Sequence, residues 1–426
     1  MSTDSVSETR TDNTPAKTGD AIWITLRETP RPAKALLVGV FISKLAGFIQ
    51  LFLVVFLTTR GFSAEQAGIA LGCYGAGAVL GSFVGGMLTD RLSPRTTTLI
   101  SMCGSAVLIL SVLYLSQFAL LLIAVTLVSG VGQLYRPAAQ VLLTEMTPKH
   151  RLIMVTAMYR LALNLGTTVA PLIGAALFTI SYDLLFWAEA LAAVLYALIA
   201  AFALPGGARV RKKVADDAVT AGRIGYRAVF ADKRYSIYLL AVLLISIVYC
   251  QYTAALPLDI ITSGLSLWWY GAVVAINGFI VITCELLMTK ATQNWPIRLT
   301  AFFGFALVSV GYAVYAISPL PVFFILGTLI WTLSEIIGGP TVFAYPGMAG
   351  PEHLRGRYIG AMQSAFGLGG AIGPVIGVML WYNVGRAVWL WAALVAAAAT
   401  AAAMFGMRIQ TRNAGQPEPD HGTQGG

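Results

Sequence analysis

Twelve apolar runs, each long enough to cross a lipid bilayer as a helix, occupy most of the 426-residue sequence. A spanning helix needs about 20 apolar residues, and only helices and closed barrels satisfy their backbone hydrogen bonds inside lipid. The runs lack the short alternating pattern of barrel strands. We therefore predict an all-α polytopic membrane protein with twelve transmembrane helices. The runs cover residues 35–59, 65–88, 96–116, 118–145, 152–178, 184–204, 235–261, 267–289, 298–316, 321–349, 356–382 and 387–406.

The distribution of positive charge predicts which side of the membrane each loop occupies. The formal net charge is +9, and most of the 28 Lys and Arg residues cluster in alternate segments between the runs. We place 23 of them in the tails, the central linker and the short loops of one side, whereas Arg60 and Arg386 fall on the other side. This asymmetry predicts a cell-membrane protein with both termini in the cytoplasm. The charge therefore indicates a lipid bilayer as partner and no nucleic acid.

The chain contains one long pattern twice, with a shift of 203 residues. The shift superposes Pro137 on Pro340, Pro148 on Pro351, His150 on His353, Gly166 on Gly369, Pro171 on Pro374 and Gly174 on Gly377. Two homologous halves of six helices are therefore expected, in two pseudo-symmetric bundles. The predicted divisions are a disordered cytoplasmic N-tail (1–33), an N-terminal bundle (34–204), a basic cytoplasmic linker (205–234), a C-terminal bundle (235–406) and a cytoplasmic C-tail (407–426).

The loop after the second run carries Gly86, Asp90, Arg91 and Arg95 in the order G-x-L-x-D-R-x-x-x-R. This order resembles the loop 2–3 signature of the major facilitator superfamily, with Ser93 at a position where the family usually has glycine. The resemblance implies the major facilitator fold, with a binding site between the bundles near mid-membrane.

The same resemblance implies that Gly86, Asp90, Arg91 and Arg95 form a cytoplasmic gate by meeting the start of helix 11. A carboxylate near a helix N-terminus is favourable by roughly 0.3–1 kcal/mol, which agrees with that role. The alternative is an ordinary turn whose arginines only set the topology.

Small residues and proline recur on the fifth and eleventh runs. The fifth run carries Gly166, Pro171 and Gly174 in a pattern that resembles the helix 5 signature of drug–proton antiporters, with Ala170 in place of the usual glycine. Proline bends a helix, and small residues allow close packing, so we predict packing and hinge roles. The eleventh run repeats the pattern with Gly369, Gly373, Pro374 and Gly377. A third glycine stripe, on the second run, consists of Gly77, Gly81 and Gly85.

Charged residues inside the runs are expensive in lipid and therefore mark function by default. Glu335 lies in the middle of the tenth run, and the surrounding WTLSE…P stretch resembles a prokaryotic multidrug branch in which a helix 10 acid takes part in proton coupling. We predict that Glu335 carries protons, with Glu285, Lys44 and Arg136 as further candidates. Arg160 and Glu189, by contrast, are interpreted as structural or as reaching toward the membrane surface.

These patterns predict a secondary active transporter, most simply a proton-coupled exporter of small amphiphilic drugs or natural products. Proton-coupled uptake of a metabolite is the alternative, and an intramembrane enzyme is a remote one, because HExxH and GxSxG motifs are absent. No Walker sequence occurs, so the proton gradient is the expected energy source, without a cofactor, catalytic residues or a metal. We expect an aromatic and Met-rich cavity with few charges, and a functional monomer.

Overall fold

The computed structural model describes residues 22–205, 225–266 and 268–407, and within these ranges the chain forms helices and no strands. Eleven stretches are long and apolar enough to span a membrane, and the last of them, Glu352–Gly406, contains two helices separated by a turn. Gly385 in this turn has φ 55°, a left-handed conformation that favours glycine. Counting the two helices separately gives the twelve predicted spans and confirms the all-α polytopic membrane fold.

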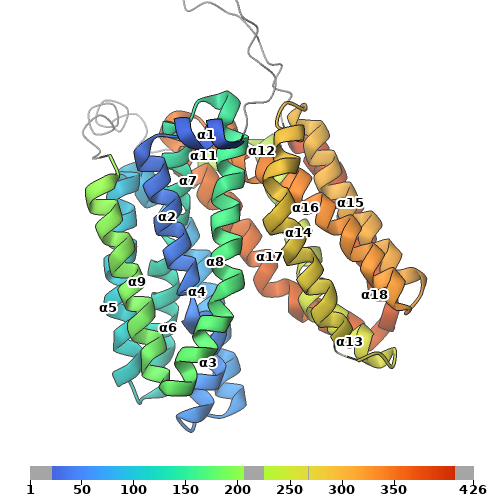
Figure 1. Ribbon diagram of the computed structural model, residues 1–426, viewed down its shortest axis with the longest axis horizontal. Coiled ribbons are helices and arrows are strands. Elements are labelled where there is room, and N and C mark those ends of the chain that lie inside the picture. Colours follow the sequence, from blue (N-terminus) through green and yellow to red (C-terminus); the bar gives the residue numbers. More distant parts are fainter. Residues whose placement is uncertain (1–21, 206–224, 267, 408–426) are drawn as a thin grey trace, which may run out of the picture.

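The spans form two bundles (Figure 1). The N-terminal bundle consists of α2 (Arg31–Leu45), α3 (Phe48–Thr59), α4 (Ala64–Arg91), α5 (Pro94–Tyr114), α6 (Phe118–Gln133), α7 (Tyr135–Met146), α8 (Leu152–Ile180) and α9 (Tyr182–Ala203). The C-terminal bundle consists of α12 (Lys233–Tyr249), α13 (Gln251–Thr262), α14 (Trp268–Thr292), α15 (Ile297–Ile317), α16 (Pro321–Ala349), α17 (Arg355–Val384) and α18 (Val388–Gly406).

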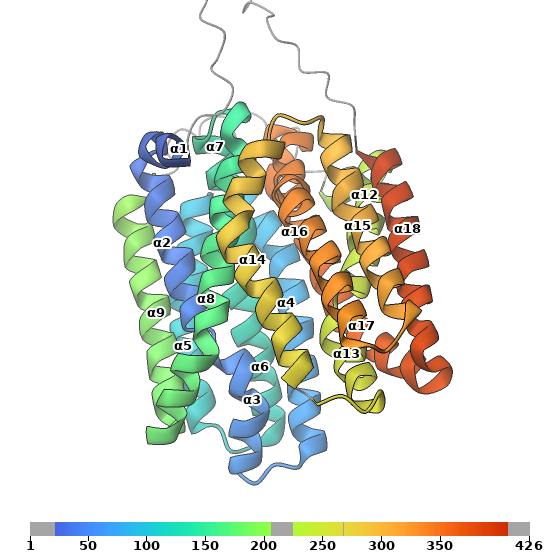
Figure 2. The same cartoon turned by 45° about the vertical axis from the view of Figure 1, so that its right-hand side comes forward.

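We call the face where α9 ends and α12 begins the linker face. Figure 1 shows the two bundles close together at the linker face and farther apart at the opposite face. Two pairs of helices join the bundles, because α4 packs along α17 and α8 packs along α14 (Figure 2). These pairs are equivalent under the repeat, so the two bundles meet about a pseudo-two-fold axis.

Equivalent arginines show that the repeat extends to individual contacts. Arg95, at the start of α5, donates a hydrogen bond to the carbonyl of Ala201 near the end of α9. Arg298, 203 residues later, donates from Nη2 to the carbonyl of Met404 at 2.5 Å. Each arginine thereby binds backbone carbonyls at the C-terminal end of a helix, where cations are favourable.

Three spans, the first, fourth and seventh, are each divided into two helices. The first is interrupted at Ala46 and Gly47, between α2 and α3. There the Oε2 atom of Glu189 accepts a hydrogen bond from the backbone N–H of Ile49 at 2.7 Å. A carboxylate at the start of a helix satisfies backbone donors that the break leaves free. Glu189 therefore has a structural role, in agreement with its interpretation from the sequence.

Order begins earlier in the chain than predicted. Residues 1–33 were expected to be disordered, but α1 spans Ile22–Glu28 and α2 begins at Arg31. The Lys34 ammonium donates to the Arg27 carbonyl at 3.0 Å, and Glu28 forms an ion pair with Arg151. Apolar periodicity could not reveal this segment because polar contacts hold it. Residues 1–21 and 408–426 of the predicted tails lie outside the described residues.

The predicted linker also contains a helix, α11 (Tyr226–Ala231). The ring of Tyr226 stacks on that of Phe83 in α4, with centroids 3.5 Å apart, and its hydroxyl donates to the Phe83 carbonyl. The end of the linker therefore packs on the N-terminal bundle before α12 begins at Lys233. Residues 206–224 of the linker lie outside the described residues.

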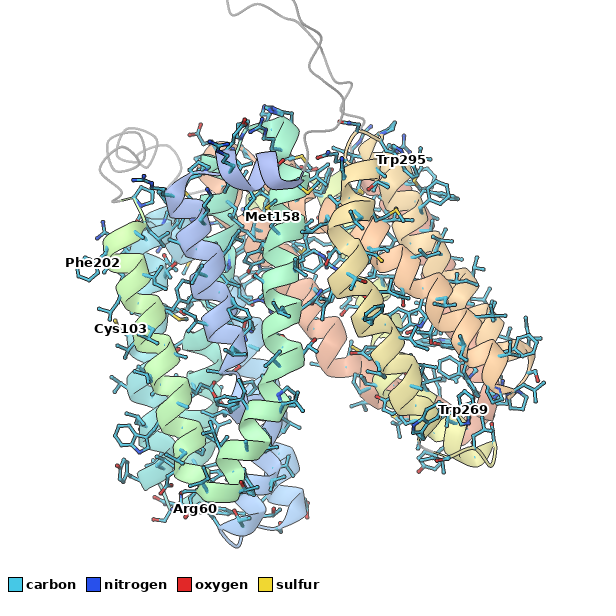
Figure 3. All side chains as sticks on the ribbon, viewed as in Figure 1. Arg60, Cys103, Met158, Phe202, Trp269 and Trp295 are labelled. Atoms are coloured by element: carbon cyan, nitrogen blue, oxygen red, sulfur yellow. The ribbon has the colours of Figure 1, made fainter. Side chains whose placement is uncertain are left out.

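Large apolar side chains cover the outer surface, as expected for contact with lipid (Figure 3). Phe202, for example, is 86% exposed. Figure 3 places Trp295 at the linker face and Arg60 at the opposite face. Arg60 donates to the carbonyls of Leu113 and Leu115, both at 3.1 Å.

Candidate functional site

A cavity of about 310 Å³ lies between the two bundles and is lined by both. Its N-terminal wall is polar and basic: α2 contributes Lys44, α7 contributes Arg136, and α8 contributes Arg160, Asn164 and Thr167. This volume is at the lower end of the range for small-molecule sites. Its position between two homologous bundles is the expected place for a transported molecule.

The C-terminal wall of the cavity is mostly apolar and aromatic, with one acid. Its larger side chains are Val242, Ile245, Tyr249, Phe305, Val308, Glu335, Val342, Phe343, Met362 and Phe366. We predicted an aromatic and Met-rich lining with few charges. The aromatic part of this prediction agrees with the C-terminal wall, but the prediction of few charges is wrong, because three basic groups and Glu335 line the same cavity.

An ionic cluster joins the two bundles at this cavity. The Nε atom of Arg160 lies 2.5 Å from Oε1 of Glu285, and its Nη2 atom lies 3.3 Å from Oε1 of Glu335. The Glu285 side chain is fully buried, whereas that of Glu335 is 15% exposed. One guanidinium from α8 is thus shared by carboxylates from α14 and α16. We refer to Arg160, Glu285 and Glu335 as the Arg160 cluster.

Neutral donors complete the surroundings of Glu335. The hydroxyl of Tyr249 donates to its Oε2 atom at 3.2 Å, and the amide of Asn277 donates to the same oxygen at 3.3 Å. The Asn277 amide also donates to the hydroxyl of Thr332 at 3.0 Å. Glu335 therefore connects α16 with α12 and α14, in addition to its contact with Arg160 on α8.

The structure brings together the two carboxylates that the sequence singled out, Glu335 and Glu285, through a cation that it did not. Lys44 and Arg136 were the predicted further candidates, whereas the structure pairs Glu335 with Arg160, which was interpreted as structural. Arg160 lies only two turns from the start of α8 at Leu152, so its long side chain had a plausible route to the membrane surface. The missed signal was the presence of two intramembrane acids, which need a buried cation.

Lys44 and Arg136 line the cavity and form no ion pair with a described residue. Within the described residues, no carboxylate oxygen lies within 4.0 Å of either side chain. Arg136 reaches the side-chain oxygen of Gln133 at 3.4 Å. Lys44 also lines a neighbouring cavity of about 60 Å³ that includes Glu189, whose carboxylate faces the break in the first span.

At the linker face, Asp90 lies against the first turn of α17. Its Oδ1 atom accepts from the backbone N–H of Gly356 at 2.7 Å, and Oδ2 accepts from that of Arg357 at 3.0 Å. The Arg357 guanidinium lies 3.5 Å from the same carboxylate. A Cβ atom on Gly86 would collide with the Gly356 carbonyl, so glycine is required for this close approach.

The two arginines of the same loop do not reach across to the other bundle. Arg95 binds the end of α9 within its own bundle, and Arg91 is exposed. Within the described residues, the contact between bundles at this position is made by Gly86 and Asp90, and the gate role of the four loop residues stays a prediction.

The pseudo-symmetric position on the linker face lacks the carboxylate. Gln293 occupies the position equivalent to Asp90, and the start of α8 occupies the position equivalent to that of α17. The structure has a hollow of about 930 Å³ there, lined by Thr144, Lys149, His150 and Gln293 among others. The equivalent loop of the C-terminal half therefore lies at the corresponding position but carries Gln293 in place of an acid.

The glycines of the repeated patterns lie at close helix contacts. A Cβ on Gly166 would lie 2.8 Å from the Lys44 side chain on α2, and one on Gly369 would lie 2.8 Å from the Leu243 carbonyl on α12. A Cβ on Gly373 would lie 3.0 Å from the Ile247 carbonyl. Gly174 and Gly377 would meet Phe52 and Gln251 in the same way. Pro171 and Pro374 lie inside continuous helices, α8 and α17.

Two six-helix bundles around a central, ion-lined cavity define a polytopic membrane carrier. The sequence model of the Major Facilitator Superfamily matches residues 36–374, and the chain belongs to this family of transporters. The family and the fold are those of transporters and not of enzymes.

Three known proteins are similar to this chain over most of its length. An uncharacterised transporter of the superfamily from Bacillus subtilis (strain 168), YqjV, is 21% identical over 84% of this chain and 89% of its own length. The Na(+), Li(+), K(+)/H(+) antiporter of Planococcus maritimus is 23% identical over 84% and 92%. The crystal structure of the human organic anion transporter MFSD10 shares the fold, with TM-score 0.71 and 17% identity over 88% and 99% of the two chains.

Proposed function

We propose that the protein exports small amphiphilic compounds from the cell in exchange for protons. In this proposal the linker face lies in the cytoplasm, as the positive charge of its loops indicates. The observation that carries the proposal is the Arg160 cluster, which places two carboxylates and one guanidinium beside the cavity and between the moving halves.

The charge balance of the cluster makes it suitable for carrying one proton. With both acids ionised, Arg160 neutralises only one of them, so the cluster has a surplus negative charge in a poorly solvated place. One proton, or one cationic group of a cargo molecule, cancels this surplus. Proton and cargo thus compete for the same charge, and such mutual exclusion is what an exchanger requires.

Glu335 is the member of the cluster that exchanges the proton in this proposal. Its side chain lines the cavity and is partly exposed, whereas Glu285 is fully buried behind Arg160. The Arg160–Glu335 distance of 3.3 Å is also longer than the 2.5 Å distance to Glu285. Glu285 is therefore the constant partner of Arg160, and Glu335 is the exchangeable one.

The contacts of Asp90 supply the conformational part of the proposal. While Asp90 holds the first turn of α17, the bundles stay together at the linker face, and cargo has access only from the opposite face. Release of this contact would allow the alternate arrangement. A single chain forms both walls of the cavity and both contacts, so in this proposal the protein functions as a monomer.

Two other transport functions use the same residues. Uptake of a metabolite with protons would also need a titratable acid in the cavity, and it differs from export only in the coupling and direction. Exchange of metal cations for protons is suggested by the name of the Planococcus maritimus relative. Three basic side chains in the lining oppose a site for free metal cations.

The test is transport by purified protein in liposomes with an imposed pH gradient. Replacing Glu335 with Gln keeps its size and hydrogen bonding but removes the exchangeable proton. We expect the variant to fold and to exchange cargo downhill, while uphill movement driven by the pH gradient falls at least about tenfold. Gradient-driven transport at the wild-type rate in Glu335→Gln would overturn the role of this residue. Movement of cargo in the same direction as the protons would favour proton-coupled uptake.

A further inference from the structure

In the central cavity, Lys44 and Arg136 lie on the wall formed by the N-terminal bundle, and Glu335 lies on the wall formed by the C-terminal bundle. Lys44 and Arg136 extend from the N-terminal bundle, and within the described residues neither has a carboxylate oxygen within 4.0 Å. Cations in a poorly solvated cavity are unfavourable unless a counter-charge is present. The Arg160 cluster has the opposite imbalance of charge, because its two carboxylates share a single guanidinium.

The surroundings of the two basic groups point to an anionic ligand. Asn164, which lines the same wall, has an amide nitrogen that is buried and makes no hydrogen bond. Lys44 also lines the neighbouring 60 Å³ cavity together with Glu189, whose carboxylate accepts from the N–H of Ile49 and interacts electrostatically with Lys44 without forming an ion pair with it. Arg136, Lys44 and the free amide of Asn164 therefore offer donors to a carboxylate oxygen pair.

An aromatic surface also lines the cavity. Phe305, Phe343 and Phe366 line the C-terminal wall, and the guanidinium of Arg160 lies 5.2 Å from the centre of the Phe343 ring. Flat rings pack well against such a surface, with offset or edge-on contacts. The volume of about 310 Å³ limits the ligand to a compact molecule.

We propose that the cargo is amphoteric: a compact aromatic compound with a carboxylate beside Lys44 and Arg136 and a basic amine beside Glu335. This inference rests on the proposed function only in taking the cavity as the cargo site. It explains why a cavity that exchanges a cation for a proton also carries two further positive charges. The amine takes the place of the proton, while the carboxylate keeps the same partners.

Binding can be measured without transport, with three ligands that share one skeleton. We would titrate 6-(aminomethyl)-2-naphthoic acid, its primary amide, which lacks the carboxylate, and 2-naphthoic acid, which lacks the amine. The full-length protein in lipid nanodiscs is used at one pH, with binding measured by calorimetry. We expect the amphoteric acid to bind at least about tenfold more tightly than either relative, because each charge-assisted contact contributes separately.

Variants assign each end of the ligand to its residues. Lys44→Gln and Arg136→Gln should each weaken binding of the amphoteric acid at least about tenfold and leave binding of the amide unchanged. Glu335→Gln should weaken binding of the two amines and leave 2-naphthoic acid unchanged. Lys44→Arg and Arg136→Lys, which keep the charge, should bind with affinity close to that of wild type. Lys290→Gln, an exposed lysine at the end of α14, is the control.

Several outcomes would overturn the inference. One is tighter or equal binding of the primary amide, and another is loss of amide binding in Lys44→Gln or Arg136→Gln, which would indicate general damage to the cavity. Failure of all three ligands to bind the wild-type protein also overturns it. The binding measurements use no pH gradient, so their outcome does not depend on the transport assay with Glu335→Gln. The proposal of an amphoteric cargo and the proposal of proton-coupled export can therefore be refuted independently.

Discussion

At the scale of single residues, Arg160 supplies the positive charge that compensates the carboxylates beside the cavity. Removing it leaves Glu285 buried without a partner, which costs roughly 3–5 kcal/mol. We expect Arg160→Gln to lower the thermal stability in detergent strongly, and Arg160→Gln with Glu285→Gln to recover most of it. The double variant should still fail in pH-driven transport, because Glu335 then has no charged partner.

Comparing the single and the double variant separates the contribution of Arg160 to stability from its contribution to proton coupling. A double variant as unstable as Arg160→Gln would show that Arg160 acts through packing, for example against Phe343, and not through its charge. A double variant that transports like wild type would show that the cluster does not couple protons. Arg160→Lys keeps one charge but not the two-sided contact, and an intermediate stability is expected.

The sequence identified individual charged residues better than their partners. Glu335 and Glu285 stand out because acids are rare inside apolar runs, and that argument needs no knowledge of the fold. Which cation meets them depends on how α8 lies against α14 and α16, a relation between bundles that no local pattern contains. Tyr249 and Asn277 contact Glu335 for the same reason, and neither could be selected from the sequence.

At the scale of helices, glycine spacing controls how closely neighbours approach. In α4, a Cβ on Gly81 would collide with the backbone carbonyl of Gly130 in α6, whereas one on Gly75 would meet no atom within 4 Å. We expect Gly81→Ala to destabilise the protein by roughly 1–3 kcal/mol, because the backbone contact must open. Gly75→Ala, in the same helix, should be neutral or slightly stabilising.

Thermal unfolding of the two variants in detergent, followed by transport at equal expression, measures this difference. Equal melting temperatures for Gly81→Ala and Gly75→Ala would show that the stripe is incidental. The stripe itself was predictable, since a spacing of four residues places glycines on one face. That α6 is the helix packed against it was not, because the partner depends on the arrangement of the whole bundle.

The helix boundaries also divide into those that the sequence predicts and those that depend on contacts between helices. The apolar runs predicted the twelve spans to within a few residues, because lipid contact fixes both their composition and their length. The breaks at Ala46–Gly47, Leu134 and Cys250 lie inside continuous apolar runs and left no mark in hydropathy. Helices α1 and α11 were missed because ion pairs, hydrogen bonds and ring stacking hold them.

At the scale of the whole molecule, we expect Asp90 to set the balance between conformations open to one face or the other. Asp90→Asn loses the ionic contact with Arg357 and one acceptor for the backbone of α17. We expect the linker face to open more often, by roughly two- to fivefold, which corresponds to the 0.3–1 kcal/mol of a carboxylate at a helix N-terminus.

A position in the contact between α17 and α4 reports this opening. Ser364 of α17 donates to the Val79 carbonyl of α4 at 3.1 Å. In a background without Cys73, Cys103, Cys250 and Cys284, a cysteine introduced by Ser364→Cys should react faster with a membrane-impermeant maleimide when Asp90→Asn is added. Arg91→Gln, which changes an exposed charge in the same loop, is the matched control. Unchanged labelling in Asp90→Asn would remove Asp90 from the gate.

The hollow beside Gln293 means that the two edges of the linker face are not equally closed. One edge is held where Asp90 meets α17, and the other, beside the start of α8 and the end of α14, has a hollow of about 930 Å³ lined by both bundles. In the proposed orientation, cytoplasmic water fills this hollow while the cavity itself stays closed on that side. The two helices beside the hollow, α8 and α14, pack along each other and carry Arg160 and Glu285, so we expect an opening that begins at this edge to separate first the two residues of that ion pair.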